Sequence, residues 1–543
     1  MNRILSLDNL FEDGCVYTAD RSQYDVCLEQ TIKSRDEFHL KYMFDYKKRE
    51  MPIAFYLKGR KNVTLDFAGA TLKLHGQIQP ILLEDCENIT VKNCVIEYDR
   101  AAHSEAEILE ITEDTVRLKF GDAFPYRVDV ENKGLIFTSD TWESTSRPSP
   151  LFYQPFDKES RLGLGLDLGV TGENIIVPED WPYPYWHFLA EEDGDTVILH
   201  GAHPSGWKVG NIIAIPHEAR WLTALTTMNC RNIHIQNFRI INGFSMGLAP
   251  FNTENFYVDR LIATYDSRSR GIISNTADLI HAVGCKGEMI IENSVFEGMI
   301  DDALNVHGNF LSAINSDGCT LHVQNTSQLP TSFARIFNVG DTIASYNGPT
   351  MERIGIGKIE SITWIDGENA VIVTDVPVEV SNGGLIENLS TQPNLTVRNC
   401  VFGKANSHIR LQTRGKVLFE NSTLELPIIL TGDASYWYES SPVQDLTIQN
   451  CSFTLPRAII QICPEFIPTP KAPYYHENIK IMNNTFVSQT PLIGGYSNNI
   501  VFTGNTNSAS EDMTIILTSC GSCVCDNATV ERITKEKTEM NRG

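Results

Sequence analysis

The sequence predicts an all-β fold, a right-handed parallel β-helix (solenoid) with two inserted small β-barrel-like domains. Along the chain, a polar residue and an Asn precede alternating apolar residues, and a second polar residue then precedes an aromatic or aliphatic one. Copies of this pattern occupy residues 88–96, 232–240, 255–262, 288–296, 394–402, 416–424, 445–453, 478–486 and 499–505. Self-similarity at a period of about 20–50 residues is typical of a solenoid, and alternation with period two predicts strands. Asn and Gly between the strands suit the tight corners of a coil.

The repeat divides the chain into segments that carry it and segments that do not. The expected segments are an N-terminal cap with a helix (1–50), first rungs (51–102), a first insert (103–216), coil with the catalytic rungs (217–309), a second insert (310–389), and C-terminal rungs with a cap (390–543). Both inserts contain short Gly-punctuated strands and a Val-Gly-polar-x-Ile-Ala stretch, at 209–214 and 339–344. This composition predicts small antiparallel β-barrels grown from loops of the coil.

Charge and hydropathy argue against several function classes. The chain has 543 residues and a formal net charge of −24, which argues against binding to nucleic acid or to a membrane surface. No apolar run reaches the roughly 18 residues of a membrane span, and the first residues lack the apolar core of a signal peptide. The compartment is left open, either cytoplasmic or secreted with the signal removed, and so is a homodimeric state.

Three aspartates are the strongest candidates for catalysis. Asp278 lies 23 residues before Asp301 and 24 before Asp302, close to one turn of the coil. Residues one rung apart stack at about 4.8 Å, so Asp278 is expected beside the Asp301–Asp302 pair. Clustered carboxylates shift one another's proton affinities, which favours acid–base chemistry. Asp301 and Asp302 can face the same side only if the strand begins, bends or bulges there. The alternative is that these aspartates cap turns.

Other polar residues near these rungs are candidate substrate contacts. They are Asn275, His281, Asn305, His307, Arg410, His217 and Arg220. Removing the second insert brings Arg410 about one rung beyond His307, where it would bind a substrate hydroxyl or orient a carboxylate. The aromatic run at 181–187 could stack on a sugar ring or fill the core of the first insert.

Neither a metal nor a cofactor is expected from the motifs. The spacing of Asp278, His281 and Asp301 matches no recognised zinc or non-haem iron pattern. No Gly-x-Gly-x-x-Gly opens a helix and no phosphate loop is present. Cysteines beside the repeat pivots, such as Cys94 and Cys400, are expected to be small buried residues of the coil.

Together, several motifs resemble the core of glycoside hydrolase family 110. These motifs are Asn-Thr-Ala-Asp-x-x-His at 275–281, Gly-Cys-Lys-Gly at 284–287, Ile-Glu-Asn-x-x-Phe-Glu at 291–297 and Asp-Asp-Ala-x-Asn-x-His-Gly at 301–308. The family comprises β-helical exo-α-1,3-galactosidases acting on blood-group B and linear galactose-α-1,3-galactose ends. The resemblance implies an inverting exo-glycosidase that hydrolyses terminal α-1,3-linked galactose from an oligosaccharide or glycoconjugate.

A weaker similarity to the polygalacturonase family implies roles for the aspartates. By that parallel, Asp301 resembles the general acid, and Asp278 with Asp302 resembles the pair that activates water. Two alternatives from the same chemistry are a polygalacturonase-like enzyme and one that releases α-N-acetylgalactosamine. A third alternative is a non-catalytic glycan-binding β-helix, which would hold the aspartates apart or turn them inward.

Overall fold

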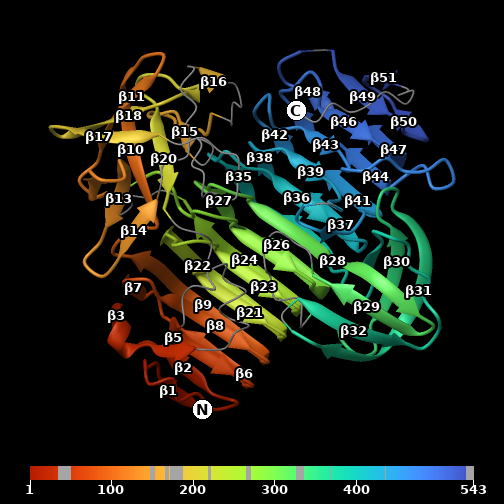
Figure 1. The fold of residues 1–543 in the computed structure, drawn as a ribbon, viewed down its shortest axis with the longest axis horizontal. Coiled ribbons are helices and arrows are strands. Elements are labelled where there is room, and N and C mark those ends of the chain that lie inside the picture. The colour runs from red at the N-terminus through yellow and green to blue at the C-terminus, as the bar shows by residue number, and fades with distance from the viewer. Residues whose placement is uncertain are drawn as a thin grey trace.

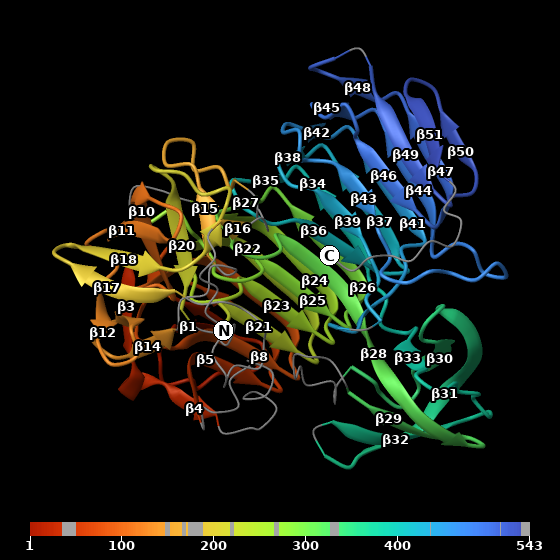
Figure 2. The ribbon, with the colours of Figure 1, turned by 45° about the horizontal axis from the view of Figure 1, so that its top comes forward.

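The computed structural model is a long stack of β-strands from which two β-rich excursions protrude (Figures 1 and 2). It describes residues 1–34, 50–146, 153–164, 170–171, 188–217, 222–264, 271–325, 336–366, 368–434, 436–510 and 512–533. Within these ranges the sole helical element is the 3-10 helix η1 (Leu28–Gln30), so the protein is all-β as predicted. No helix in the described part of the chain has the length and apolar character needed to cross a membrane.

One face of the coil is a 21-stranded sheet whose strands pair in parallel from rung to rung. Its strands are β1 (Asn2–Ile4), β2 (Val16–Thr18), β3 (Gln23–Cys27), β6 (Lys61–Asp66), β7 (Thr71–His75), β9 (Glu87–Tyr98), β22 (Arg231–Asn242), β24 (Glu254–Ala263), β26 (Lys286–Glu292), β27 (Val295–Glu297), β34 (Asn394–Arg398), β35 (Val401–Gly403), β37 (Lys416–Glu420), β38 (Thr423–Leu424), β41 (Asp445–Gln449), β42 (Ser452–Phe453), β44 (His476–Met482), β45 (Thr485–Phe486), β47 (Ser497–Thr503), β48 (Thr506–Asn507) and β50 (Cys523–Cys525). We call it the first face. The predicted parallel β-helix is confirmed.

A second face carries the rungs of interest. Its strands are β4 (Ile32–Ser34), β5 (Met51–Lys58), β8 (Gln79–Glu84), β21 (Leu225–Met228), β23 (Leu248–Phe251), β25 (Ile280–Val283), β28 (Leu304–Asp317), β36 (Ile409–Gln412), β39 (Ile428–Leu430), β43 (Ile460–Ile462), β46 (Leu492–Gly495), β49 (Thr514–Thr518) and β51 (Thr529–Ile533). From β5 onward neighbouring rungs of this face pair in parallel, for example β25 with β28 and β28 with β36. Apolar side chains from both faces fill the interior, where Phe296 stacks on Phe402 with ring centres 4.5 Å apart. Cys94 and Cys400 are buried there, as predicted.

Asparagines form the corners that the repeat predicts. Asn88, Asn232 and Asn255 have φ of 56°, 55° and 60°, in the left-handed region that Asn tolerates better than most residues. Their side-chain amides also bond from rung to rung: Asn232 Nδ2 donates to Asn88 Oδ1 at 2.9 Å and Asn255 Nδ2 to Asn232 Oδ1 at 2.8 Å. The repeated Asn therefore sets the backbone turn and also satisfies polar groups between rungs.

The first insert forms antiparallel sheets. Its strands are β10 (His103–Ile111), β11 (Thr115–Phe120), β12 (Tyr126–Asp129), β13 (Gly134–Thr138), β14 (Glu143–Ser146), β15 (Gln154–Phe156), β16 (Val170–Thr171), β17 (Leu189–Asp193), β18 (Thr196–His200), β19 (His203–Pro204) and β20 (Ile212–Pro216). The described strands give a six-stranded sheet in the order β15-β20-β10-β11-β18-β17, a three-stranded sheet and a two-stranded one. Among the described strands of this insert the sheets stay open, so its resemblance to a barrel is partial.

The second insert closes on itself. The outer part of β28 pairs with β29 (Thr320–Gln324) and β33 (Leu385–Asn388). β29 continues through β32 (Asn369–Thr374), β31 (Glu352–Trp364) and β30 (Thr342–Asn347), which returns to β33. This ring of antiparallel strands is the barrel that the sequence predicts. β40 (Glu439–Ser440) pairs with β28 at the base of the insert.

The N-terminal segment contributes strands to the coil. β1 pairs in parallel with β2, β2 with β6, and β3 with β7, all on the first face. Of the helix expected in this segment, the described residues contain only η1, and residues 35–49 lie outside them.

Candidate active site

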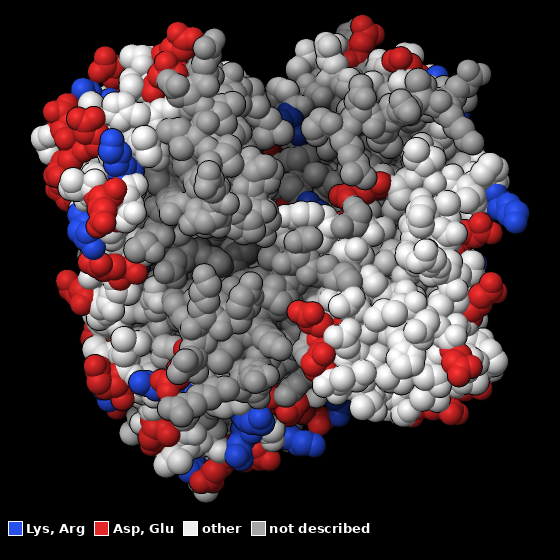
Figure 3. Space-filling view, in the orientation of Figure 1, with Lys and Arg blue, Asp and Glu red and all other residues white. Residues whose placement is uncertain are grey.

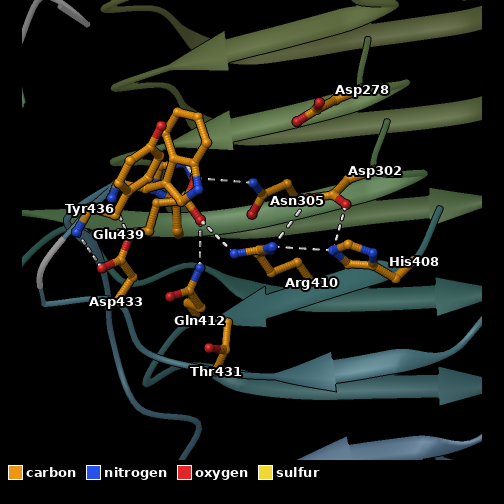
Figure 4. A network of polar contacts seen from close by, with 12 residues as sticks. Asp278, Asp302, Asn305, His408, Arg410, Gln412, Thr431, Asp433, Tyr436 and Glu439 are labelled. Carbon is orange, nitrogen blue, oxygen red and sulfur yellow. Dashed lines mark hydrogen bonds and ion pairs between the residues drawn. The ribbon is translucent and has the colours of Figure 1, made fainter. Parts of the chain in front are cut away.

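Neighbouring rungs of the second face bring most of the predicted contacts together. The register places His281 beside Asn305 and Asn305 beside Arg410. His307, two residues beyond Asn305, lies beside Gln412. Side chains two residues apart in a strand share a face, so these residues form one polar surface across β25, β28 and β36. Figure 4 shows Asn305, Arg410 and Gln412 side by side.

Asp278 and Asp302 lie on adjacent rungs, just before the strands begin. The N–H of Leu279 donates to the carbonyl of Asp302 at 2.9 Å, which ties the two rungs together. β25 begins at Ile280 and β28 at Leu304, so both aspartates precede the regular alternation of a strand. Asp278 is 1% exposed and Asp302 4% exposed, and Figure 4 shows them on neighbouring rungs above Arg410 and His408. Asp278 therefore lies one rung from Asp302, as the interval between them predicted.

Asp301 is the most exposed of the three aspartates. It is half-buried, and its Oδ1 accepts a hydrogen bond from the N–H of Asp302 at 3.0 Å. This contact is typical of an aspartate at a turn, and it also holds the two carboxylates in a fixed relation.

Asp302 is held by two side chains from the next rung. His408 Nε2 lies 2.8 Å from Asp302 Oδ1, and Arg410 Nε lies 3.4 Å from Oδ2. Burial alone would lower the pKa of Arg410, but the carboxylates of Glu439, Asp302 and Asp278 raise it above its ordinary value. Arg410 therefore stays charged beside Asp302 and Glu439. His408 was not among the predicted contacts, although it lies two residues before Arg410 and on the same face.

Two histidines form a chain that starts at Asp278. His281 Nδ1 is hydrogen-bonded to Asp278 Oδ2, and His281 Nε2 lies 3.0 Å from His307 Nε2. His307 Nδ1 donates to the carbonyl of Gly308 at 2.6 Å. Burial lowers the pKa of His307 below its ordinary value. The chain fixes the ring orientation of both histidines next to one of the predicted catalytic aspartates.

Glu439 enters the cluster from β40 and was not predicted. Gln412 Nε2 donates to Glu439 Oε2 at 2.8 Å and Asn305 Nδ2 to Oε1 at 3.4 Å. Arg410 lies 3.7 Å from Oε2, and His307 Nε2 lies 3.6 Å from Oε1. Burial would raise the pKa of Glu439, but His307 and Arg410 outweigh it and lower that pKa. Glu439 is therefore a buried carboxylate.

Glu439 also lies close to the two histidines. A carboxylate oxygen of Glu439 and ring nitrogens of His281 and His307 lie within 4.8 Å of one another. Among the described residues this is the one group with the spacing of metal ligands.

An aromatic turn borders the cluster. Buried Asp433 accepts backbone hydrogen bonds from Tyr436, at 2.8 Å, and from Trp437. The two rings meet edge to face with centres 4.6 Å apart, and both residues are half-buried. Figure 4 shows Tyr436 next to Glu439. Aromatic faces suit the C–H face of a sugar ring, so this turn can serve as a stacking surface. The aromatic run at 181–187 lies outside the described residues.

Glu465 lies beside this turn. Its N–H donates to the carbonyl of Gly432 at 3.2 Å. Partial burial, the charge of Asp433 and a hydrogen bond to that carboxylate raise the pKa of Glu465 to about 7, although the residue as a whole is exposed to solvent. A carboxyl with a raised pKa therefore lies beside the turn that carries the aromatic rings.

Two of the other predicted contacts are not part of this surface. His217 is buried, lies 2.9 Å from Ser104 Oγ and stacks on Phe137, and burial lowers its pKa well below the ordinary value. Asn275 is fully buried and its Nδ2 donates to the carbonyl of Ser245 at 3.1 Å. Both side chains are engaged in contacts that hold the fold. Arg220 lies outside the described residues.

The surface over these rungs is hollowed. Figure 3 shows a hollow between the first insert and the C-terminal rungs, over the region where Figure 1 draws β36. Acidic and basic side chains both lie along its edge.

Comparison with solved structures gives only distant similarity. The family 28 exopolygalacturonase of Yersinia enterocolitica is 10% identical, with a TM-score of 0.33 over 84% of this chain and 73% of that one. A hyperthermoactive exopolygalacturonase from Thermotoga maritima is 12% identical, with a TM-score of 0.35 over 96% of this chain and 80% of that one. Similarity at this level supports no conclusion about function. No protein-family model matches the chain.

Curated proteins give a stronger match along most of the chain. Alpha-1,3-galactosidase B of Bacteroides thetaiotaomicron is 27% identical over 483 residues, covering 84% of this chain and 75% of the relative. Alpha-1,3-galactosidase A of Bacteroides fragilis is 26% identical, covering 78% and 70%, and that of Shewanella woodyi is 25% identical, covering 83% and 75%. The chain is thus homologous to α-1,3-galactosidases over about four fifths of its length, as the resemblance of its motifs to glycoside hydrolase family 110 predicted.

Proposed function

We propose that this chain is an inverting exo-glycosidase that hydrolyses terminal α-1,3-linked galactose from oligosaccharides or glycoconjugates. The observation that carries the proposal is the position of Asp278 beside Asp302 on adjacent rungs of a chain homologous to α-1,3-galactosidases. Fold stability does not require buried aspartates on neighbouring rungs, because like charges repel when they are brought together. Their clustering is therefore best explained by chemistry.

Asp301 is assigned the role of general acid. It would donate a proton to the glycosidic oxygen as the bond between that oxygen and the anomeric carbon breaks. Its greater exposure supports the assignment, because an acid must reach the leaving oxygen.

Asp278 and Asp302 are assigned to the attacking water. Water would add to the anomeric carbon from the opposite side of the ring while its proton passes to this pair. The contacts of Asp302 with His408 and Arg410 support the assignment, because they hold its carboxylate in a fixed position. Inversion requires room for water, with roughly 6.5–9.5 Å between acid and base.

The remaining contacts are assigned to the sugar. Asn305 lies beside Arg410 on this surface, and the Tyr436–Trp437 turn offers a stacking face. We also propose that the inserts at 103–216 and 310–389 wall the cleft, so that it accepts chain ends rather than internal residues. A uronate substrate fits this surface less well, because Arg410 is already paired with Asp302 and Glu439.

Product analysis tests the proposal directly. The protein is incubated with galactose-α-1,3-galactose, with a panel of nitrophenyl glycosides and with polygalacturonate, and the first product is followed by proton NMR. We expect β-galactose to appear before mutarotation. We expect the Asp301→Asn variant to release galactose much more slowly than the unaltered chain. Initial α-galactose would show retention and overturn the roles of Asp278 and Asp302. Cleavage confined to polygalacturonate or to α-N-acetylgalactosaminides would contradict the proposed substrate.

A further inference from the structure

Three potential metal ligands converge beside the aspartates from separate strands. His281 comes from β25, His307 from β28 and Glu439 from β40. The two Nε2 atoms are 3.0 Å apart and Glu439 Oε1 is 3.6 Å from His307 Nε2. All three residues are buried, with exposures of 6%, 4% and 8%. Two imidazoles and a carboxylate are a donor set typical of zinc.

The protons of the histidines are fixed by their other ring nitrogens. The carbonyl of Gly308 can only accept, so His307 Nδ1 carries a proton. Asp278 accepts from His281 Nδ1 in the same way when it is ionised. If both rings are neutral, each Nε2 then presents a lone pair to the other at 3.0 Å. Such a contact between acceptors is repulsive unless a cation lies against both of them.

The surroundings match those of metal-bound ligands. Histidines that bind metals usually donate their second N–H to a carboxylate or a backbone carbonyl, as His281 and His307 do here. Ligating carboxylates are usually hydrogen-bonded in turn, and Glu439 accepts from Gln412 and from Asn305. The orienting contacts are therefore already built around all three donors.

Local charge favours the same conclusion. Arg410 lies 3.4 Å from Asp302 Oδ2 and 3.7 Å from Glu439 Oε2, and Asp278 is a third buried carboxylate on the neighbouring rung. The other groups beside these carboxylates are imidazoles, of His408 at Asp302, His281 at Asp278 and His307 at Glu439, and neutral imidazoles leave two of the three negative charges unbalanced. A divalent cation bound by the three donors would offset the remaining negative charge. A single proton would bridge only the two imidazole nitrogens.

We propose that His281 Nε2, His307 Nε2 and the Glu439 carboxylate bind one divalent transition-metal ion of the zinc class. This site is separate from the proposed acid–base chemistry, although it shares the hydrogen bond between His281 and Asp278. Three protein ligands leave a coordination position for water or for a sugar hydroxyl. Holding His281 in place would also hold the orientation of Asp278.

Metal binding can be measured without any substrate, so its outcome is independent of the glycosidase proposal. The full chain is freed of metal with a chelator and titrated with Zn²⁺ by calorimetry and with Co²⁺ by visible absorption. We expect one high-affinity ion per chain, a rise in Tm on adding Zn²⁺, and a Co²⁺ spectrum typical of nitrogen and oxygen ligands.

Variants locate the ion. Glu439→Gln and His307→Gln should each weaken Zn²⁺ binding by at least about 10–100-fold. The matched control His234→Gln changes a histidine that stacks on Tyr257 on the first face, and it should leave binding unchanged. Far-UV circular dichroism confirms that each variant is folded, and a variant that unfolds is replaced by His281→Gln. Absence of stoichiometric binding by the unaltered chain would overturn the proposal. Equal Zn²⁺ affinity in all variants would also overturn it. So would NMR evidence that a proton still lies between His281 and His307 at millimolar Zn²⁺.

Discussion

The two faces of the coil use polar residues in opposite ways. On the first face the same residue recurs from rung to rung, as in the bonded series Asn88, Asn232 and Asn255. On the second face the polar residues do not recur, and the rung after Arg410 places Ile429 beside it. Polar residues that repeat along a solenoid serve the stack, because every rung needs the same corner. Polar residues that interrupt the repeat have no such role, and here they gather around the predicted catalytic aspartates.

Replacing the aspartates should give the largest difference between the faces. Asp278→Asn, Asp301→Asn and Asp302→Asn should each lower kcat on an α-1,3-galactoside by at least about 100-fold, since each removes a positioned acid or base. Asp259→Asn is the matched control, because this first-face carboxylate bonds to Asn293. It should leave kcat within about twofold. Near-normal turnover in all three site variants would place the chemistry elsewhere on the molecule.

Arginine substitutions compare the ion pairs of the two faces. Arg410 is largely buried and faces Asp302 and Glu439, so Arg410→Ala leaves two buried carboxylates without their cation. The expected loss of unfolding free energy is about 3 kcal/mol. Arg398 pairs with Glu292 on the first face with 43% of its side chain exposed, so Arg398→Ala should cost below about 1 kcal/mol. Urea unfolding of both variants measures the difference, and equal losses would remove the distinction.

A corner asparagine tests whether the first face contributes only stability. Asn232 has a φ of 55°, and Ala tolerates this left-handed backbone less well than Asn, so Asn232→Ala strains the corner and also removes the bonds to Asn88 and from Asn255. The expected cost is about 1–2 kcal/mol. Asn232→Gly relieves the backbone strain and should cost less, which separates the two terms. Both variants should keep the KM of the unaltered chain, and a changed KM would mean that this face touches substrate.

Local pattern predicted much of the fold and part of the site. Alternation and recurring Asn predicted the parallel coil, and the spacing of Asp278 from Asp302 predicted their stacking, because a solenoid converts a sequence interval into a neighbouring rung. His408 could have been found, since it precedes Arg410 by two residues and shares its face. The same reasoning placed Asn275 and His217 in the site, yet nearness in sequence does not fix side-chain direction, and both are buried in contacts of the fold.

Glu439 and Asp433 could not have been predicted. Glu439 reaches Asn305 across 134 residues because β40 pairs with β28 at Gly308 and Ser440. That pairing depends on where the second insert leaves the coil, and the repeat carries no information about it. The residues around Glu439 match no motif, so this carboxylate becomes visible only in three dimensions.

The smallest expected effect concerns the pH response of the aromatic turn. Burial and the carboxylate of Asp433 raise the pKa of Glu465 to about 7, above the 4.5 of an ordinary glutamate, so the folded state prefers the protonated form. Between these two values the folded protein binds more protons than the unfolded chain, and stability therefore falls as pH rises through this window and levels off above about pH 7. Arg410 lowers the pKa of Glu465 and Glu439 raises it, and both act through partly solvated space.

Glu465→Gln keeps the shape of the side chain and removes its charge. Solvent reaches Glu465, so the pH-dependent difference in unfolding free energy between the variant and the unaltered chain should be about 1 kcal/mol or less. Above pH 7 the variant should be more stable than the unaltered chain. Its KM should also change less between pH 6 and 8, because Asp433 would keep its hydrogen bonds to the backbone of Tyr436 and Trp437. Thermal melts and KM values over this range measure both. A pH response that is identical in the two proteins would mean that the turn does not depend on the Glu465 charge.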